Sequence, residues 1–209
     1  MRALSTRVVV TTWLGMLGTG LGMLIHHGNV AGAVGRVATT LTAGLAEHLA
    51  WNTTRPLLVL CAHPQCPCLE STLGELQRAV AGRSLDLCIV TFVPTVPPAS
   101  WDPAAVDALR RDLPEARHLP DHDGALATRL GAATSGHVLL YDTTGALRFS
   151  GGVTGGRGHR GDNAAVRTLA QVLGELGRSG ADSATTAVFG CPLRADEEPR
   201  HGTSCCKPD

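Results

Sequence analysis

The sequence has no net charge and little charge of either sign. Lysine and arginine together number 18, aspartate and glutamate also number 18, and charged residues make up only 17% of the 209 residues. Proteins that bind nucleic acids usually carry a clear basic surplus, so this balance argues against that class. Hydrophobic residues make up 44% of the chain, which excludes a disordered tail and a coiled coil. The length suits one domain of ordinary size.

Internal repeats and a phosphate-binding loop are also absent from the sequence. The glycine-rich stretch from Gly151 to Gly161 lacks the Lys-Ser/Thr ending of such a loop. Cysteine, by contrast, is frequent: there are seven, and three of them lie between Cys61 and Cys68. Disulfide scaffolds spread their cysteines along the chain, whereas clustered cysteines indicate redox or metal chemistry.

An apolar run near the N-terminus predicts a membrane segment. Arg2 and Arg7 precede the run Val8–Ile25, whose 18 residues would span about 27 Å as a helix, close to a bilayer core. This length favours an uncleaved anchor, and a signal peptide cleaved at Ala31-Gly32-Ala33 is the alternative. In both cases the arginines stay in the cytoplasm and residues 35–209 are exported, in a bacterium to the oxidising periplasm.

The rest of the chain divides into parts with different patterns. We expect the membrane anchor or signal segment over residues 1–30, a tether over 31–54, a folded domain over 55–178 and a C-terminal tail over 179–209. Within the domain, short apolar runs predict buried strands and leucines three or four residues apart predict helices. The order β-α-β-α-β-α-β-β-α predicts an α/β fold with a mixed central sheet and helices on both faces. The expected strands are 57–62, 85–93, 116–119, 137–142 and 146–150, and the expected helices are 67–80, 103–111, 124–130 and one from the N-cap Asp162 to 176.

Cys66 and Cys68 lie at the predicted start of the first domain helix. The free N–H groups and the dipole of a helix N-terminus stabilise a thiolate, which is the reactive form of cysteine. Only Pro67 separates the pair, so a Cys66–Cys68 disulfide would close a small, strained ring that is easily reduced. We expect Cys66 to be the better exposed of the two. A pair of buried structural thiols is the alternative.

Three local matches give the chain a resemblance to a known family. They are LLVLCAHPQCPC at 57–68, GAATSGHVLLYDTTG at 131–145, and GGVTGGRGHRGDN at 151–163 followed by VFGCPL at 188–193. With the order of strands and helices, they resemble the thioredoxin fold near its peroxiredoxin and TlpA-like branches. Within that fold they look like the RedB-type membrane-anchored thioredoxin-like proteins of bacteria. The resemblance covers about residues 55–193 and the N-terminal anchor.

The resemblance implies a thiol–disulfide oxidoreductase or thiol-dependent reductase without a cofactor. It would lie in the bacterial inner membrane as a single-pass protein, with a cytoplasmic N-terminus and a periplasmic domain. Its partners would be protein thiols and disulfides or a small oxidised substrate. Cys66 would attack the substrate and Cys68 would resolve the mixed species, while His63, Ser135, Gly136 and His159 shape the pocket. Gly136 aligns with the cis-proline that covers the sulfurs in thioredoxins, so we expect a more open site.

The remaining cysteines have several interpretations. Cys61 is either a buried core residue or a resolving partner of Cys66, and Cys88 is a core residue. Cys191 becomes a third redox thiol if the tail folds back to the site. Cys205 and Cys206 are adjacent in the tail and are assigned no role.

His63 is a candidate catalytic residue, and His137 and His159 are candidate accessory residues. His63 would stabilise a thiolate, bind a metal or remain an exposed loop residue. We expect His137 to face the cysteine loop, because it begins the hairpin, and His159 to flank the site from the glycine-rich loop.

A copper-handling chaperone is the alternative function. Two thiolates and an imidazole suit Cu(I), and Cys66, Cys68 and either His137 or His159 would supply them. The resemblance speaks against it, because such chaperones separate their cysteines by three residues. A peroxidase, whose proline and threonine or serine pattern is absent here, and a redox-inactive structural member are further alternatives.

Overall fold

The structure is a computed structural model that describes residues 2–177 and 182–194, and the chain divides into units 1–30 and 31–209. The first unit is the helix α1 (Arg2–Asn29). Its segment Thr6–Asn29 is long and apolar enough to cross a membrane, and none of its most apolar stretch is buried. A signal sequence meets the same test, so both interpretations of this segment stand.

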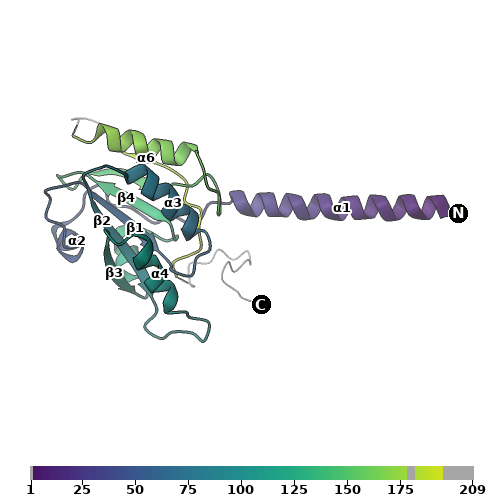
Figure 1. The fold of residues 1–209 in the computed structure, drawn as a ribbon, viewed down its shortest axis with the longest axis horizontal. Helices are drawn as coiled ribbons and strands as arrows, with labels where there is room; N and C mark the ends of the chain where they lie inside the picture. The colour runs from purple at the N-terminus through teal and green to yellow at the C-terminus, as the bar shows by residue number, and fades with distance from the viewer. Residues whose placement is uncertain (1, 178–181, 195–209) are drawn as a thin grey trace. The chain divides into compact units, whose positions relative to one another are not determined.

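A mixed sheet, six-stranded over the described residues, forms the centre of the second unit (Figure 1). The strand order is β3-β2-β1-β4-β5-β6. The central strand β1 pairs in parallel with β2 and antiparallel with β4, and β4 and β5 form an antiparallel hairpin. The strands are β1 (Leu57–Ala62), β2 (Asp86–Val93), β3 (Arg117–His122), β4 (His137–Tyr141), β5 (Leu147–Gly151) and β6 (Ala184–Thr185).

Helices cover both faces of the sheet because successive side chains of β1 point to opposite faces. Leu58 and Leu60 pack against the helices α3 (Leu69–Val80), α4 (Ala104–Asp112) and α6 (Ala164–Glu175). Leu57 and Val59 belong to the opposite core, with the helices α2 (Ala43–His48) and α5 (Ala125–Leu130). Figure 1 shows α3 and α6 beside each other over the first face.

This arrangement confirms the predicted α/β, thioredoxin-like fold. The parallel pair β1 and β2 is joined by α3, and the hairpin of β4 and β5 is followed by α6. A crossover helix between parallel strands is the expected connection in such a sheet. The cysteine loop therefore lies at the carboxyl end of a central strand, where it reaches the helix α3.

The structure adds two segments to the domain beyond the predicted range 55–178. Residues 31–54, expected as a tether, pack on the sheet through bridges such as Thr40 to Ala146 and through buried Leu45 and Trp51. Residues 182–194 of the expected tail form β6 and continue along the domain. Residues 195–209, which include Cys205 and Cys206, lie outside the described residues.

Candidate active site

The loop between β1 and α3 carries the cysteine pair. The Cys66 N–H donates to the His63 carbonyl (3.0 Å), and the Leu69 N–H donates to the Cys66 carbonyl (3.0 Å). After these two turns the helix α3 begins at Leu69, two residues later than the expected start at Pro67. Cys68 is its N-cap, and Cys66 lies two residues before the cap.

The cysteine pair is buried, contrary to the expectation of an open site with an exposed Cys66. Cys66 is 4% exposed and Cys68 is 9% exposed. Residues 186–193, here called the strap, lie against this part of the domain. Cys191 in the strap is 1% exposed and belongs to the same core cluster as the pair.

The strap is held by backbone pairing with the segment before β4. The Ser135 N–H donates to the Cys191 carbonyl (2.8 Å), and the Leu193 N–H donates to the Ala133 carbonyl (2.9 Å). Between them, Thr134 and Pro192 form an antiparallel bridge. This short ladder brings Cys191, which lies 125 residues along the chain from Cys66, to the cysteine loop.

Gly190 permits this close approach. A Cβ atom at this position would lie 2.0 Å from the Ser135 carbonyl oxygen, a distance that real Cβ atoms do not reach. The Gly190 carbonyl also accepts a hydrogen bond from the Arg157 side chain, which comes from the glycine-rich loop. The strap is therefore held on two sides directly beside Cys191.

Cys66, Cys68 and Cys191 form a cluster of thiols around the sulfur of Cys66. The Cys191 N–H donates to Cys66 Sγ (3.4 Å). Hydrogen bonds from the side chains of Cys191 and Cys68, and from their backbones, lower the pKa of Cys66 far below that of an ordinary thiol, against the opposing effect of burial. Hydrogen bonds to the charged form of an acid favour that form. These hydrogen bonds therefore favour the thiolate form of Cys66.

His63 packs in an aromatic group beside the cysteine loop. Its ring stacks on Phe92 at 5.0 Å between centroids and meets Trp101 edge to face at 5.9 Å. Burial lowers its pKa, and the nearby Cys66 opposes this effect. His63 Nδ1 accepts the Gln65 N–H (3.3 Å), so this nitrogen carries no proton. A neutral His63 can shape the site without neutralising the Cys66 thiolate.

Ser135 and Gly136 connect the cysteine loop to the segment before β4. Ser135 Oγ accepts the N–H of His63 (2.9 Å). Gly136 has φ +90 and donates its N–H to the Cys61 carbonyl (2.9 Å). A Cβ at Gly136 would lie 3.1 Å from Thr72 Oγ1 on α3, which leaves little room for a side chain.

His137 lies away from the cysteine loop that it was expected to face. Along β4, Val138 and Leu140 belong to the core cluster of Cys66, and alternation turns His137 to the other face. There its Nε2 lies 2.9 Å from Ser150 Oγ. Burial lowers the pKa of His137 to about 4.

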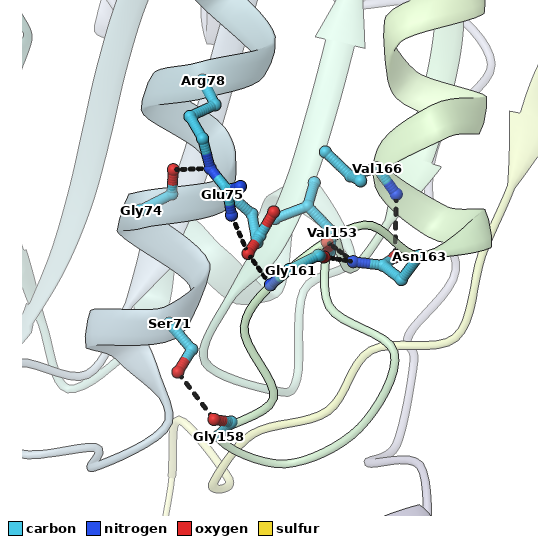
Figure 2. Close-up of polar contacts among 9 residues, drawn as sticks. All are labelled: Ser71, Gly74, Glu75, Arg78, Val153, Gly158, Gly161, Asn163 and Val166. Atoms are coloured by element: carbon cyan, nitrogen blue, oxygen red, sulfur yellow. Dashed lines mark hydrogen bonds and ion pairs between the residues drawn. The ribbon is translucent and has the colours of Figure 1, made fainter.

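The glycine-rich loop is pinned to α3 (Figure 2). Ser71 Oγ donates to the Gly158 carbonyl (2.9 Å), and the buried Glu75 carboxylate accepts the Gly161 N–H (2.6 Å). His159 in this loop has an exposed side chain. The loop therefore lies beside α3, and the Arg157 side chain, which donates to the Gly190 carbonyl, links it to the strap.

The two other described cysteines lie on the opposite face of the sheet. Cys61 and Cys88 both belong to the second core cluster. Burial raises the pKa of both thiols and is the largest cause in each case; it raises that of Cys88 to about 12. Both are therefore neutral core thiols, and the alternation along β1 separates Cys61 from the cluster around Cys66.

The described residues do not bring together the ligand set of the copper alternative. Among residues 2–177 and 182–194, no group of three or more His, Cys, Asp or Glu side chains is arranged to hold a metal ion. His137 lies on the far face of the sheet and His159 is exposed. The copper alternative stays an untested prediction.

Some residues of the site have no local signal in the sequence. Phe92 and Trp101 surround His63, and their ring centroids lie 6.2 Å apart. The proline-rich stretch after β2 brings Trp101 back to the loop, where Gln65 Nε2 donates to the Ser100 carbonyl (2.9 Å). Aromatic residues make up only 3% of the chain, and this scarcity is the one feature of the sequence that could have marked Phe92 and Trp101 as site residues.

Comparisons with known proteins support the fold. No family model matches the chain, and no curated protein is significantly similar to it. A hypothetical protein from Sinorhizobium meliloti matches with a TM-score of 0.54 at 20% identity, covering 79% of this chain and 94% of the other. An uncharacterized conserved protein from Geobacillus kaustophilus matches with a TM-score of 0.55 at 13% identity, covering 78% and 92%. A secreted disulfide oxidoreductase of Mycobacterium tuberculosis is less similar, with a TM-score of 0.42 at 14% identity, covering 58% of this chain and 82% of the other.

Proposed function

We propose that this protein is a thiol–disulfide oxidoreductase in which Cys66 is the attacking thiolate. The observation that carries the proposal is the set of hydrogen bonds from Cys191 and Cys68 to Cys66 Sγ. They stabilise a thiolate just before the N-terminus of α3, whose dipole acts in the same direction. A buried structural thiol would have its pKa raised, as in Cys61 and Cys88.

The reaction is a pair of thiol–disulfide exchanges. The Cys66 thiolate attacks one sulfur of a substrate disulfide, and the other sulfur leaves as a thiolate and takes up a proton. A second thiol in contact with Cys66, for which the sequence predicts Cys68, then attacks Cys66 Sγ and releases the substrate. Two protein thiols lose two electrons, and the substrate disulfide gains them.

The substrate class in this proposal is a disulfide of a protein or a small oxidised thiol compound. The half-buried rings of His63, Phe92 and Trp101 offer an apolar surface beside the loop. Such a surface suits the apolar flank of a disulfide, and the neutral ring of His63 leaves the thiolate charge available for attack.

We also propose that α1 is an uncleaved anchor and that the domain faces the periplasm. A cleavage site at residues 31–33 would remove residues that the domain uses. The Gly32 N–H donates to the Val188 carbonyl in the strap (2.8 Å), and the Ala33 carbonyl accepts the Thr134 hydroxyl (2.7 Å). The N-terminal sequence of the mature protein tests this: it should begin at or near Met1, and a start at Val34 contradicts it.

Reduction of the insulin interchain disulfides by dithiothreitol, with the full-length chain in detergent as catalyst, tests the enzymatic proposal. The wild type should accelerate the reaction and Cys66→Ser should abolish the acceleration. Cys88→Ser is the matched control, because it removes a neutral thiol on the opposite face of the sheet, and should behave as the wild type. Equal rates for Cys66→Ser and the wild type contradict the proposal.

A further inference from the structure

The strap is a fixed part of the site, because its backbone forms hydrogen bonds with the rest of the domain both before and after Cys191. Upstream of Cys191, the Thr186 N–H donates to the Ser150 carbonyl and the Gly152 N–H to the Ala187 carbonyl, both at 3.2 Å. Downstream, residues 191–193 pair with 133–135. A Cβ at Gly151 would lie 2.1 Å from Thr186 Oγ1, so this edge fits the strap closely.

Cys191 has a better position than Cys68 to form a disulfide with Cys66. Cys68 is the N-cap of α3, and its carbonyl accepts the Thr72 N–H (3.3 Å), which ties its backbone into the first turn. A bond between Cys66 and Cys68 would span a single proline, and such a short link strains disulfide geometry. Cys191 comes from a separate segment and already contacts Cys66 Sγ through its own N–H.

The strap also occupies the backbone groups that an extended substrate would need. The N–H of Ser135 and the carbonyl of Ala133 are engaged by residues 191 and 193. An extended peptide can pair with residues 133–135 only where these backbone groups are available. The sulfur of Cys191 therefore lies at Cys66 in the place that a sulfur on a peptide paired with these residues would take.

We propose that Cys191 is the resolving thiol of this protein, and that the strap holds it beside Cys66 in the position that an extended substrate strand would occupy. The inference rests on the proposed function, because it takes Cys66 as the attacking thiolate. It assigns to Cys68 the role of a hydrogen-bond donor that stabilises the thiolate.

The exchange steps balance with the substrate disulfide as oxidant. In the first step a bond forms between Cys66 Sγ and one substrate sulfur, the substrate S–S bond breaks, and the released sulfur takes up a proton. In the second step Cys191 gives up its proton and its sulfur attacks Cys66 Sγ. The Cys66–Cys191 bond forms, the mixed disulfide breaks, and the second substrate sulfur leaves as a thiol.

The fate of a mixed disulfide on Cys66 tests the inference. The reduced full-length chain in detergent is mixed with glutathione disulfide, quenched with acid and mapped by peptide mass spectrometry. In Cys191→Ser the glutathione adduct on Cys66 should persist about tenfold longer or more than in the wild type, because an intramolecular thiol has a high effective concentration. Cys68→Ser should still clear the adduct, because Cys191 remains, and should contain a Cys66–Cys191 disulfide. Cys88→Ser is the control.

The opposite pattern overturns the inference: an adduct that persists in Cys68→Ser and not in Cys191→Ser, or a Cys68→Ser chain without the Cys66–Cys191 bond. If Cys191→Ser does not fold, the disulfide map of Cys68→Ser decides alone. The outcome is separate from that of the proposed function, which fails if Cys66→Ser still reduces insulin at the wild-type rate. Loss of insulin reduction in Cys66→Ser together with resolution by Cys68 overturns the inference only.

Displacing the strap provides a second test that keeps every thiol. Gly190→Ala places a Cβ against the Ser135 carbonyl and should lift Cys191 from Cys66, so the adduct should persist as in Cys191→Ser. Gly174→Ala on α6 is the matched control, since nothing lies within 4 Å of its added Cβ. Wild-type resolution in Gly190→Ala that yields a Cys66–Cys68 disulfide, with no Cys66–Cys191 bond, overturns the inference.

Discussion

Removing the side chain of Cys191 should raise the pKa of Cys66 by about one unit. Among the causes that lower this pKa, the hydrogen bond from the Cys191 side chain is the largest. A hydrogen bond to a charged group contributes about 1.5–3 kcal/mol, and a thiol is a weak donor, so we take about 1.5 kcal/mol for Cys191→Ala. Since one pKa unit corresponds to about 1.4 kcal/mol, the shift is about one unit.

The assay follows the ultraviolet absorbance of the thiolate as a function of pH in the full-length reduced chain. Cys66→Ser identifies the part of the signal that belongs to Cys66. The pKa in Cys191→Ala should stay below the ordinary thiol value of about 8.5, because the backbone N–H of residue 191 still donates to Cys66 Sγ. Cys88→Ala should leave the pKa unchanged. An unchanged or lower pKa in Cys191→Ala, or an equal rise in Cys88→Ala, refutes the reasoning.

Three further predictions concern stability. In the folded chain the pKa of His137 is about 4, below its ordinary 6.5, so folding stability should fall between these values as the pH is lowered, by at most about 1.4 kcal/mol per unit. Acid unfolding should be shallower in His137→Gln, and equal slopes contradict this. The pKa of Cys66 is lower in the folded chain than in the unfolded chain, so the thiolate adds folding stability in full above about pH 8.5, and this stability is lost as the pH falls. Denaturant unfolding of Cys66→Ser should therefore depend less on pH than that of the reduced wild type. Buried Asp121 accepts the N–H groups of Leu126 (2.7 Å) and Ala127 (2.9 Å), so thermal unfolding should show Asp121→Ala to be about 3 kcal/mol less stable, and Asp121→Asn less affected. Equal losses in the two variants contradict this cause.

The sequence predicts the elements of the fold whose signal is local. The strand β1 begins and ends where its apolar run predicts, and α3 ends at Val80 as its leucine spacing indicates. The start of α6 differs by one residue, because Asn163, and not Asp162, accepts the Val166 N–H as the cap (3.0 Å). Such differences arise where two neighbouring side chains have the same capping chemistry.

The candidate site could be predicted only in part, because it depends on contacts between distant segments. Cys66 and Cys68 are found from their place between a strand and a helix. The strap has no hydrophobic period of its own, and its place follows from pairing with residues 133–135 and from the missing side chain of Gly190. The orientation of His137 depends on the register of β4 against β1, which a single residue reverses.

The central claim is that Cys66 is the thiolate that attacks disulfides, and its direct test is to locate the first covalent adduct. The full-length chain with Cys68→Ser and Cys191→Ser is incubated with glutathione disulfide at neutral pH, quenched with acid and mapped by peptide mass spectrometry. Neither replaced thiol can then resolve an adduct at Cys66. The account predicts that glutathione appears first on Cys66. Glutathione that appears only on other cysteines, with Cys66 unmodified, would contradict it.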